Sequence, residues 1–260
     1  MPPADGEVRL PGGNVGGAVR VGDTVRRRTG PWTTAVHGLL DYLAGTGLAA
    51  VPRVHGFDEA GREVLDYLPG EVIDVDTSTL SDTRLASTGR WLRSFHEAVA
   101  TYCPGPQRWY FGMQSLQDGQ IICHNDVAPY NMAFDADGLV GVFDWDLAGP
   151  GDPVDDLAFL AWNAVPLVRP VNELDDAAIA RRLCLLADAY ADPAVEASTL
   201  LDAALARMRT ATDRIEAGQR AGDEGMLALG RVGEPARTRA RIDEAMHRVA
   251  GIKAALIPRC

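Results

Sequence analysis

Lysine is almost absent from this chain, which has 25 basic residues but a single lysine, Lys253. Any site that needs a positive side chain before residue 253 must therefore use arginine. The five histidines and four cysteines include no CxxC pair and no cluster with the spacing of a zinc site. The sequence thus excludes a zinc-finger type of protein and favours free thiols in a reducing compartment.

Long apolar runs are also lacking. The longest mainly apolar stretch, residues 157–168, is too short to span a bilayer. The first ten residues have neither the basic start nor the apolar core of a signal peptide. We therefore expect a soluble cytoplasmic protein.

The charge balance is acidic, with a net charge of −11 and a pI of about 4.9. A surplus of carboxylates disfavours non-specific binding to nucleic acid or to an anionic membrane, so neither is expected as a partner. Hydrophobic residues make up 47% of the chain and charged residues 23%, which is typical of a globular protein with a sizeable core. The oligomeric state stays open.

The first quarter of the chain reads as a small antiparallel sheet with one helix. Strand-like runs flank the Gly22–Asp23 turn, which is a hairpin signal, and two more surround the turn at residues 58–61. Between them, residues 31–44 have apolar residues at helical spacing, with Gly45 as the expected stop.

The character of the sequence changes at Pro69–Gly70. From about residue 80 the pattern is mostly helical, interrupted by short strand-like runs within residues 120–148. Four further helices are expected, at residues 153–165, 175–191, 198–218 and 234–256. The fold class is therefore α+β. We expect a β-rich lobe at residues 1–68 and a larger helical lobe at residues 69–260, with a hinge at about 66–70 and the ligand cleft between them.

The chemistry is concentrated in two short motifs, His124-Asn125-Asp126-Val127-Ala128-Pro129-Tyr130-Asn131 and Val142-Phe143-Asp144-Trp145-Asp146. Asp126 and Asn131 are separated by a proline-containing loop, and Asp144 follows an apolar strand. Two carboxylates and an amide oxygen are hard ligands of the kind that Mg²⁺ and a phosphate ester require. The spacing H-x-D-x-x-x-x-N is that of the kinase catalytic loop.

Together with the run AGPGDPVDDLA that follows, these motifs resemble those of the aminoglycoside phosphotransferase family of kinase-like small-molecule phosphotransferases. The resemblance extends over roughly residues 8–165. It implies a two-lobed protein-kinase-like fold and an ATP-dependent transfer of the γ-phosphoryl group to a hydroxyl of a small molecule. It also implies Asp126 as the catalytic base and Asn131 and Asp144 as magnesium ligands. GTP in place of ATP stays open.

The remaining candidate residues have supporting or nucleotide-binding roles. His124 is expected to orient the loop through hydrogen bonds to the backbone, and Asp152 to cap the helix that begins at Pro153. In the hinge, Asp66 and Leu68 would offer backbone groups to a purine. A glycine-rich turn before the second strand would let backbone amides approach phosphates; its candidates are Gly12, Gly13, Gly16 and Gly17.

The phosphate-binding lysine of kinases is missing, and the expected helix at residues 31–44 has no glutamate to pair with it. Strand alternation favours Arg27 as the replacement, with Arg26 as the second choice. His37 and Asp41 are the nearest polar residues of that helix. The missing pair favours one alternative, a nucleotide-binding pseudokinase with a regulatory or scaffold role and no turnover.

The acceptor is not defined by the sequence. A polycationic aminoglycoside needs clustered carboxylates in the helical C-terminal part, yet residues 171–260 hold 14 acidic and 13 basic residues. Another alcohol is therefore the favoured acceptor. The aromatic run at residues 109–111 is expected to belong to the core rather than to stack on the acceptor.

Overall fold

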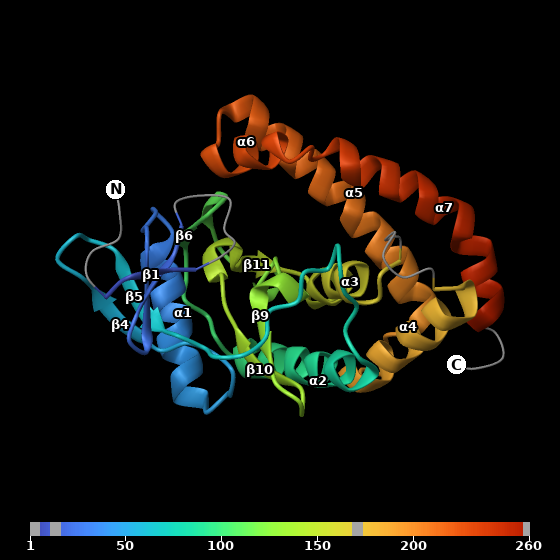
Figure 1. Cartoon of the computed structure of the whole chain (residues 1–260), viewed down its shortest axis with the longest axis horizontal. Helices are drawn as coiled ribbons and strands as arrows, with labels where there is room; N and C mark the ends of the chain where they lie inside the picture. Colours follow the sequence, from blue (N-terminus) through green and yellow to red (C-terminus); the bar gives the residue numbers. More distant parts are fainter. Residues whose placement is uncertain (1–5, 11–16, 168–173, 257–260) are drawn as a thin grey trace.

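The computed structural model describes residues 6–10, 17–167 and 174–256. They form the two-lobed α+β, kinase-like fold that the sequence predicts, with a small sheet-containing lobe and a larger, mainly helical lobe (Figure 1). Among the described residues, none of the helices combines the length and the apolar character that crossing a membrane requires.

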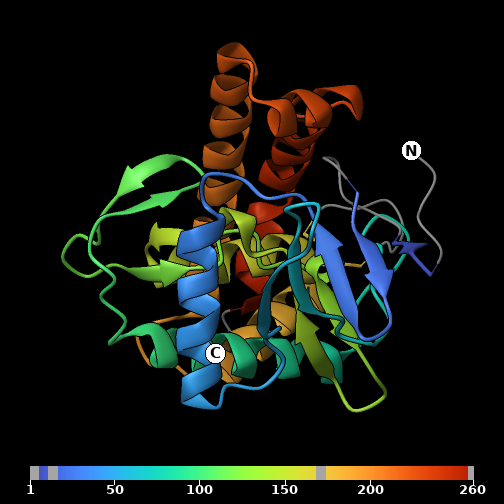
Figure 2. The same ribbon diagram turned by 90° about the vertical axis from the view of Figure 1, so that its left-hand side faces the viewer.

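The N-terminal lobe is built on a five-stranded antiparallel sheet with the order β1-β2-β3-β5-β4 (Figure 2). Its strands are β1 (Val8–Arg9), β2 (Val19–Val21), β3 (Thr24–Arg27), β4 (Val54–Phe57) and β5 (Glu63–Asp66). The Gly22–Asp23 hairpin is confirmed, because β2 and β3 pair directly on either side of this turn. Position 22 has a φ of 59°, which favours glycine.

Helix α1 (Thr33–Thr46) joins β3 to β4 and buries Leu39, Leu40 and Leu43 completely. The expected stop at Gly45 is wrong by two residues. The helix ends at Gly47, whose φ of 79° provides the left-handed C-terminal cap, whereas Gly45 remains in the last helical turn. The sequence offers both glycines, and only the backbone conformation distinguishes them.

The connection between the lobes is fixed to a hairpin of the larger lobe formed by β9 (Met132–Phe134) and β10 (Leu139–Val142). The backbones of Glu71 and Phe134 exchange two hydrogen bonds of 2.8 and 2.9 Å. Gly70 has no room for a side chain, because a Cβ there would lie 2.9 Å from the Phe134 nitrogen. The connecting segment is therefore held against the β9–β10 hairpin.

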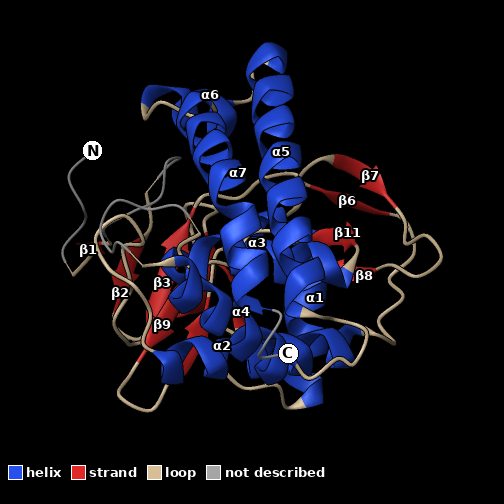
Figure 3. Cartoon of the chain, turned by 90° about the vertical axis from the view of Figure 1, so that its right-hand side faces the viewer, coloured by secondary structure: helices blue, strands red, loops and turns tan. Residues whose placement is uncertain are grey.

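The larger lobe packs its helices around one apolar core, and α5 and α7 lie side by side (Figure 3). Its helices are α2 (Asp82–Val99), α3 (Pro153–Ala164), α4 (Asp176–Tyr190), α5 (Ala197–Ala221), α6 (Glu224–Arg231) and α7 (Ala236–Leu256). The four helices expected after residue 150 are present as α3, α4, α5 and α7. The sequence reading missed α6, as well as the short hairpin of β6 (Gln107–Trp109) and β7 (Gly112–Gln114).

The thiols differ from the expectation at one position. Cys103 and Cys123 are free, whereas Cys184 is disulfide-bonded. The expectation of free thiols throughout is therefore wrong at Cys184. Cysteine spacing does not indicate this bond, because no two cysteines lie at a diagnostic spacing.

Candidate active site

The loop that carries His124 to Asn131 begins at the end of β8 (Ile121–Cys123), which pairs with β11 (Gly149–Gly151). The short 3-10 helix η1 (Pro129–Asn131) ends the loop. His124 is fully buried, and its Nε2 lies 3.2 Å from the carbonyl oxygen of Phe143. This contact ties the loop to the segment that leads into Asp144.

Asp156 of α3 holds the start of the loop in place. Its carboxylate accepts hydrogen bonds of 2.7 Å from the backbone amides of both His124 and Asn125, and His96 lies 3.3 Å away. Burial alone would raise the pKa of Asp156, but the hydrogen bond and the charge of His96 hold it below its ordinary value. Sequence reasoning did not predict this role of Asp156 at the start of α3. The neighbouring Asp152 does cap that helix, accepting from the Val154 amide at 2.8 Å.

Asn125 has a φ of 65°, a left-handed conformation that glycine adopts most readily. Asparagine also tolerates this left-handed conformation. Its side-chain amide donates to the carbonyls of Leu147 and Gly149 at 3.1 and 3.3 Å. On the other side, Arg207 of α5 donates to the Asn125 carbonyl at 3.0 Å. Asn125 therefore links the loop both to the segment after Asp146 and to the helical lobe.

Asp126, Asn131 and Asp144 come together in space. Asn131 donates its amide nitrogen to Asp126 Oδ2 at 2.8 Å, which leaves its amide oxygen as the atom that a Mg²⁺ ion would use. The backbone amide of Phe143 donates to the Asn131 carbonyl at 3.0 Å, so Asp144 is held next to the loop. Burial, and then the negative charge of Asp144, raise the pKa of Asp126 to about 7. These oxygen donors fit Mg²⁺.

Arg27 enters this acidic cluster from the N-terminal lobe. Its guanidinium contacts Glu63 at 2.5 Å and Asp144 at 2.9 Å, and it also pairs with Asp146. Burial opposes the charge of Arg27, but Asp144, Asp146 and Glu63 outweigh it and raise the pKa of the guanidinium. Arg26 points elsewhere, toward Asp58 at 3.9 Å. The structure thus directs Arg27, rather than Arg26, to the acidic cluster.

The partner of Arg27 comes from a strand and not from a helix. Glu63 lies directly opposite Arg27 in the β3–β5 pairing and is only 2% exposed. His37 of α1 approaches the second oxygen of Glu63 at 2.9 Å, whereas Asp41 is exposed on the same helix. Sequence reasoning missed Glu63 because it looked for an acidic partner only in the helix. Pairing of the two strands that carry Arg27 and Glu63 is the signal that could have pointed to this cross-strand neighbour.

The other predicted nucleotide-binding residues are only partly placed. Gly12, Gly13 and Gly16 lie outside the described residues, and Gly17 is described just before β2. The Asp66 carboxylate accepts from the Arg53 amide at 3.1 Å and lies 2.7 Å from His55, and the Asp66 amide donates to the Arg53 carbonyl at 3.1 Å. Neither its side chain nor its amide is therefore offered to a base. Leu68 packs closely on Gly141 of β10. This arrangement puts the hinge over the β9–β10 hairpin.

The aromatic run before the loop divides between two environments. Trp109 is 1% exposed and belongs to the core, as expected. Phe111 is 45% exposed, and Tyr110 hydrogen-bonds to Asp223 at 2.9 Å while its ring lies 4.4 Å from that of Trp32. The core assignment is therefore wrong for Phe111 and incomplete for Tyr110.

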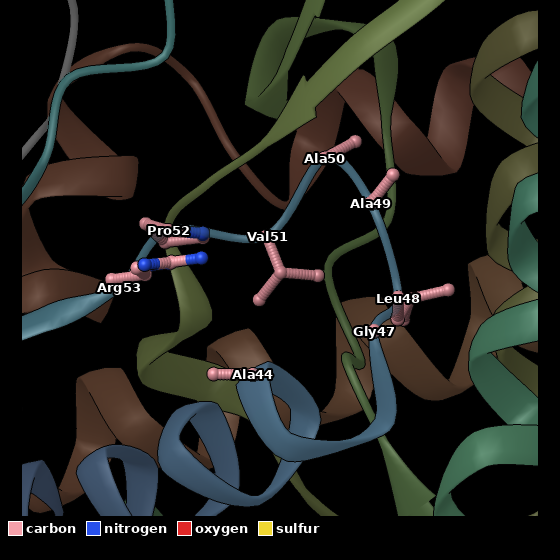
Figure 4. Close-up of a pocket in the computed structure, with 8 residues that line it drawn as sticks. All are labelled: Ala44, Gly47, Leu48, Ala49, Ala50, Val51, Pro52 and Arg53. Carbon is pink, nitrogen blue, oxygen red and sulfur yellow. The ribbon is translucent and has the colours of Figure 1, made fainter.

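A pocket of about 270 Å³ lies away from this cluster, where α1 turns toward β4 (Figure 4). It is lined by Ala44 and residues 47–53, and Arg53 is its one charged lining residue. None of the acidic residues of the cluster lines it. The pocket is therefore a separate feature of the N-terminal lobe and not the reaction site.

Comparison with known proteins supports a phosphotransferase class. The model of the phosphotransferase enzyme family matches residues 106–196, which include the whole loop and Asp144. The trifolitoxin immunity protein of Rhizobium leguminosarum bv. trifolii is 36% identical over 162 residues. That match covers 60% of this chain and 61% of the length of the relative.

Solved structures show the same fold at low identity. The amicoumacin kinase hAmiN superposes with a TM-score of 0.63 and 14% identity, covering 96% of this chain and 88% of that one. A choline/ethanolamine kinase family protein from Mesorhizobium loti superposes with a TM-score of 0.57 and 19% identity, covering 95% of this chain and 87% of that one. The chain thus has the kinase-like fold of these small-molecule kinases, and its residues 106–196 match the phosphotransferase enzyme family. The predicted resemblance to the aminoglycoside phosphotransferase family is confirmed.

Proposed function

We propose that this protein transfers the γ-phosphoryl group of ATP to a hydroxyl group of a small molecule. One observation carries the proposal: Asp126, Asn131 and Asp144 meet at one site, and Arg27 reaches it from the opposite lobe. The nucleotide would lie between a lobe of residues 1–68 and a lobe of residues 69–260. The backbone at residues 66–70 would face its base.

Each residue has a distinct task in this reaction. Asp126 accepts the proton of the attacking hydroxyl, while the hydrogen bond from Asn131 fixes the direction of its carboxylate. Asn131 and Asp144 would hold Mg²⁺, which neutralises the charge of the phosphates when it is bound. Arg27 holds the phosphates with a charge-assisted contact. Asp156 and Asn125 keep the loop in position for these tasks.

The pseudokinase alternative loses its main support. It rested on the absence of a lysine–glutamate pair, and Arg27 with Glu63 forms an equivalent ion pair by another route. A protein without turnover would have no use for a base, two metal ligands and a phosphate-binding arginine in one cluster. We therefore favour an active enzyme.

The names of the relatives point to hydroxyl acceptors of several kinds, an antibiotic and an amino alcohol among them. The near-balance of 14 acidic and 13 basic residues over 171–260 disfavours a polycationic aminoglycoside. The acceptor proposed here is consequently a small alcohol without several positive charges.

The first prediction tests this function directly. We expect purified protein with Mg·ATP to release ADP faster when its acceptor is present in a panel of choline, ethanolamine, amicoumacin, aminoglycosides and other alcohols. The measurements are coupled ADP release and the mass of the phosphorylated product. If no member of a broad panel gains a phosphate and ADP release never rises, an active phosphotransferase is ruled out in favour of the pseudokinase.

The second prediction concerns Arg27. Arg27→Ala should weaken ATP binding by roughly 10- to 150-fold, the range of a charge-assisted contact of about 1.5–3 kcal/mol. Arg27→Lys keeps a positive charge and should recover most of the affinity. Arg28→Ala is the matched control, because Arg28 is exposed and lies 3.9 Å from its nearest carboxylate, Glu224. Titration of ATP by calorimetry measures all three.

The same ATP titration tests the role of Glu63. Glu63→Gln should weaken ATP binding only through the orientation of Arg27, so the double variant with Arg27→Ala should bind no more weakly than Arg27→Ala alone. Additive losses in the double variant would show that Glu63 acts independently. A large loss in Arg26→Ala with none in Arg27→Ala would assign the phosphates to the other arginine.

A further inference from the structure

The hydroxyl of Tyr130 contacts Asp126, the residue proposed as the catalytic base. It donates a hydrogen bond of 3.0 Å to Asp126 Oδ1. The other carboxylate oxygen, Oδ2, already accepts from the Asn131 amide at 2.8 Å. Oδ1 is therefore the oxygen left to take a proton, and Tyr130 covers it.

The Tyr130 hydroxyl occupies the position next to Asp126 Oδ1 that the hydroxyl of the alcohol substrate must take. A base accepts a proton only from a group within about 2.6–3.2 Å, and the phenol oxygen stands at that distance. Tyr130 is four residues after Asp126 and belongs to η1, so the short loop itself directs the ring across the carboxylate. An acceptor hydroxyl that loses its proton to Oδ1 must displace the phenol.

The Tyr130 ring lies at the surface and is not part of the core. Tyr130 is 37% exposed, whereas its neighbours Pro129 and Asn131 are buried. An exposed aromatic side chain changes rotamer far faster than an enzyme turns over. A bound alcohol can therefore replace the phenol without opening the core, while a single water molecule must compete with a phenol that is already in place.

We propose that the Tyr130 hydroxyl is a positioning group that keeps water off Asp126 until the acceptor replaces it. This inference rests on the proposed function. Without the phenol, a water molecule hydrogen-bonds to Oδ1, gives its proton to Asp126 and attacks the γ-phosphorus. The bond from that phosphorus to the β,γ-bridging oxygen breaks, and ADP and inorganic phosphate leave. Tyr130 thus selects alcohol over water.

The test measures phosphate release from Mg·ATP with no acceptor added. Tyr130→Phe keeps the ring and removes only the hydroxyl, and it should hydrolyse ATP about 2- to 12-fold faster than the parent, the value of one net hydrogen bond. Tyr130→Ala should be at least as fast. Tyr42→Phe is the matched control, because its hydroxyl bonds to the Ala98 carbonyl at 3.1 Å, away from the base. It should leave hydrolysis unchanged.

The outcomes separate this inference from the proposed function. If Tyr130→Phe binds ATP normally and its hydrolysis equals or falls below that of the parent, the inference is overturned, while acceptor-dependent transfer still supports the function. A phosphate found on Tyr130 itself by mass spectrometry also overturns it, because the phenol would then be an acceptor. Adding Asp126→Asn to Tyr130→Phe should abolish the extra hydrolysis, and persistence of that hydrolysis would contradict the assigned route.

Discussion

Asp126→Asn is expected to lower phosphoryl transfer by roughly 10²- to 10⁴-fold, the usual contribution of a positioned base. Asparagine has almost the volume of aspartate and keeps one of the two oxygens that accept from Asn131 and Tyr130. The hydrogen bond of 2.9 Å from Asn131 to the backbone carbonyl of residue 126 is unaffected, so the loop should keep its shape. It cannot take up a proton. Nucleotide affinity should stay near that of the parent, because Arg27, Asn131 and Asp144 are unchanged.

The measurement is the rate of product formation at saturating ATP and acceptor, with ATP affinity determined separately. Asp118→Asn is the matched control, since Asp118 is exposed in the loop before β8. Transfer by the parent should also fall on acidification, because burial and Asp144 raise the pKa of Asp126 to about 7 and a protonated base cannot accept a second proton. Parental rates in Asp126→Asn would contradict the assignment of the base.

The orientation of Arg27 is a feature that the local sequence pattern predicts. Alternation along β3 places consecutive side chains on opposite faces, and counting from the hairpin turn selected the arginine that faces the cleft. The hairpin itself is defined by two adjacent residues. Such features depend on neighbours in the chain, and a sequence displays them directly.

Glu63 and Asp156 illustrate the opposite case. Glu63 reaches Arg27 because β3 and β5 happen to pair in one register, and the two residues are 36 positions apart. Asp156 accepts from amides about 30 positions earlier. Either residue, taken alone, reads as an ordinary surface carboxylate. Their roles depend on long-range packing, which one sequence without homologues does not encode in a readable form.

Short elements were not predicted from the sequence, for a related reason. Helix α6 has eight residues, two of them glycine, so it is too short to establish a periodic pattern and has weak intrinsic helix propensity. Its N-cap is Asp223, whose carboxylate accepts from the Met226 amide and also from the Tyr110 hydroxyl. Packing against α5 and this tertiary contact stabilise it. The longer helices, whose apolar faces repeat over several turns, were all predicted.

Asp144→Asn is expected to lower transfer as severely as the loss of the base, by roughly 10²- to 10⁴-fold. A metal ion contributes several kcal/mol of charge stabilisation in phosphoryl transfer, and an amide ligand carries no charge to hold it. The backbone should tolerate the change, because Asp144 has a φ of 62° and asparagine is among the residues that best adopt this conformation. Arg27 keeps its contacts with Glu63 and Asp146.

The variant also separates the metal role from the base. Because the negative charge of Asp144 helps to raise the pKa of Asp126, its removal should lower that pKa and leave the base more fully ionised. A loss of activity in Asp144→Asn therefore cannot come from a protonated base. The decisive measurement is a magnesium titration of transfer, with the exposed Asp137→Asn as the matched control. If Asp144→Asn reached the parental rate at ordinary magnesium concentration, Asp144 would not be a metal ligand, and the cluster around Arg27 would be an ion-pair network without a metal.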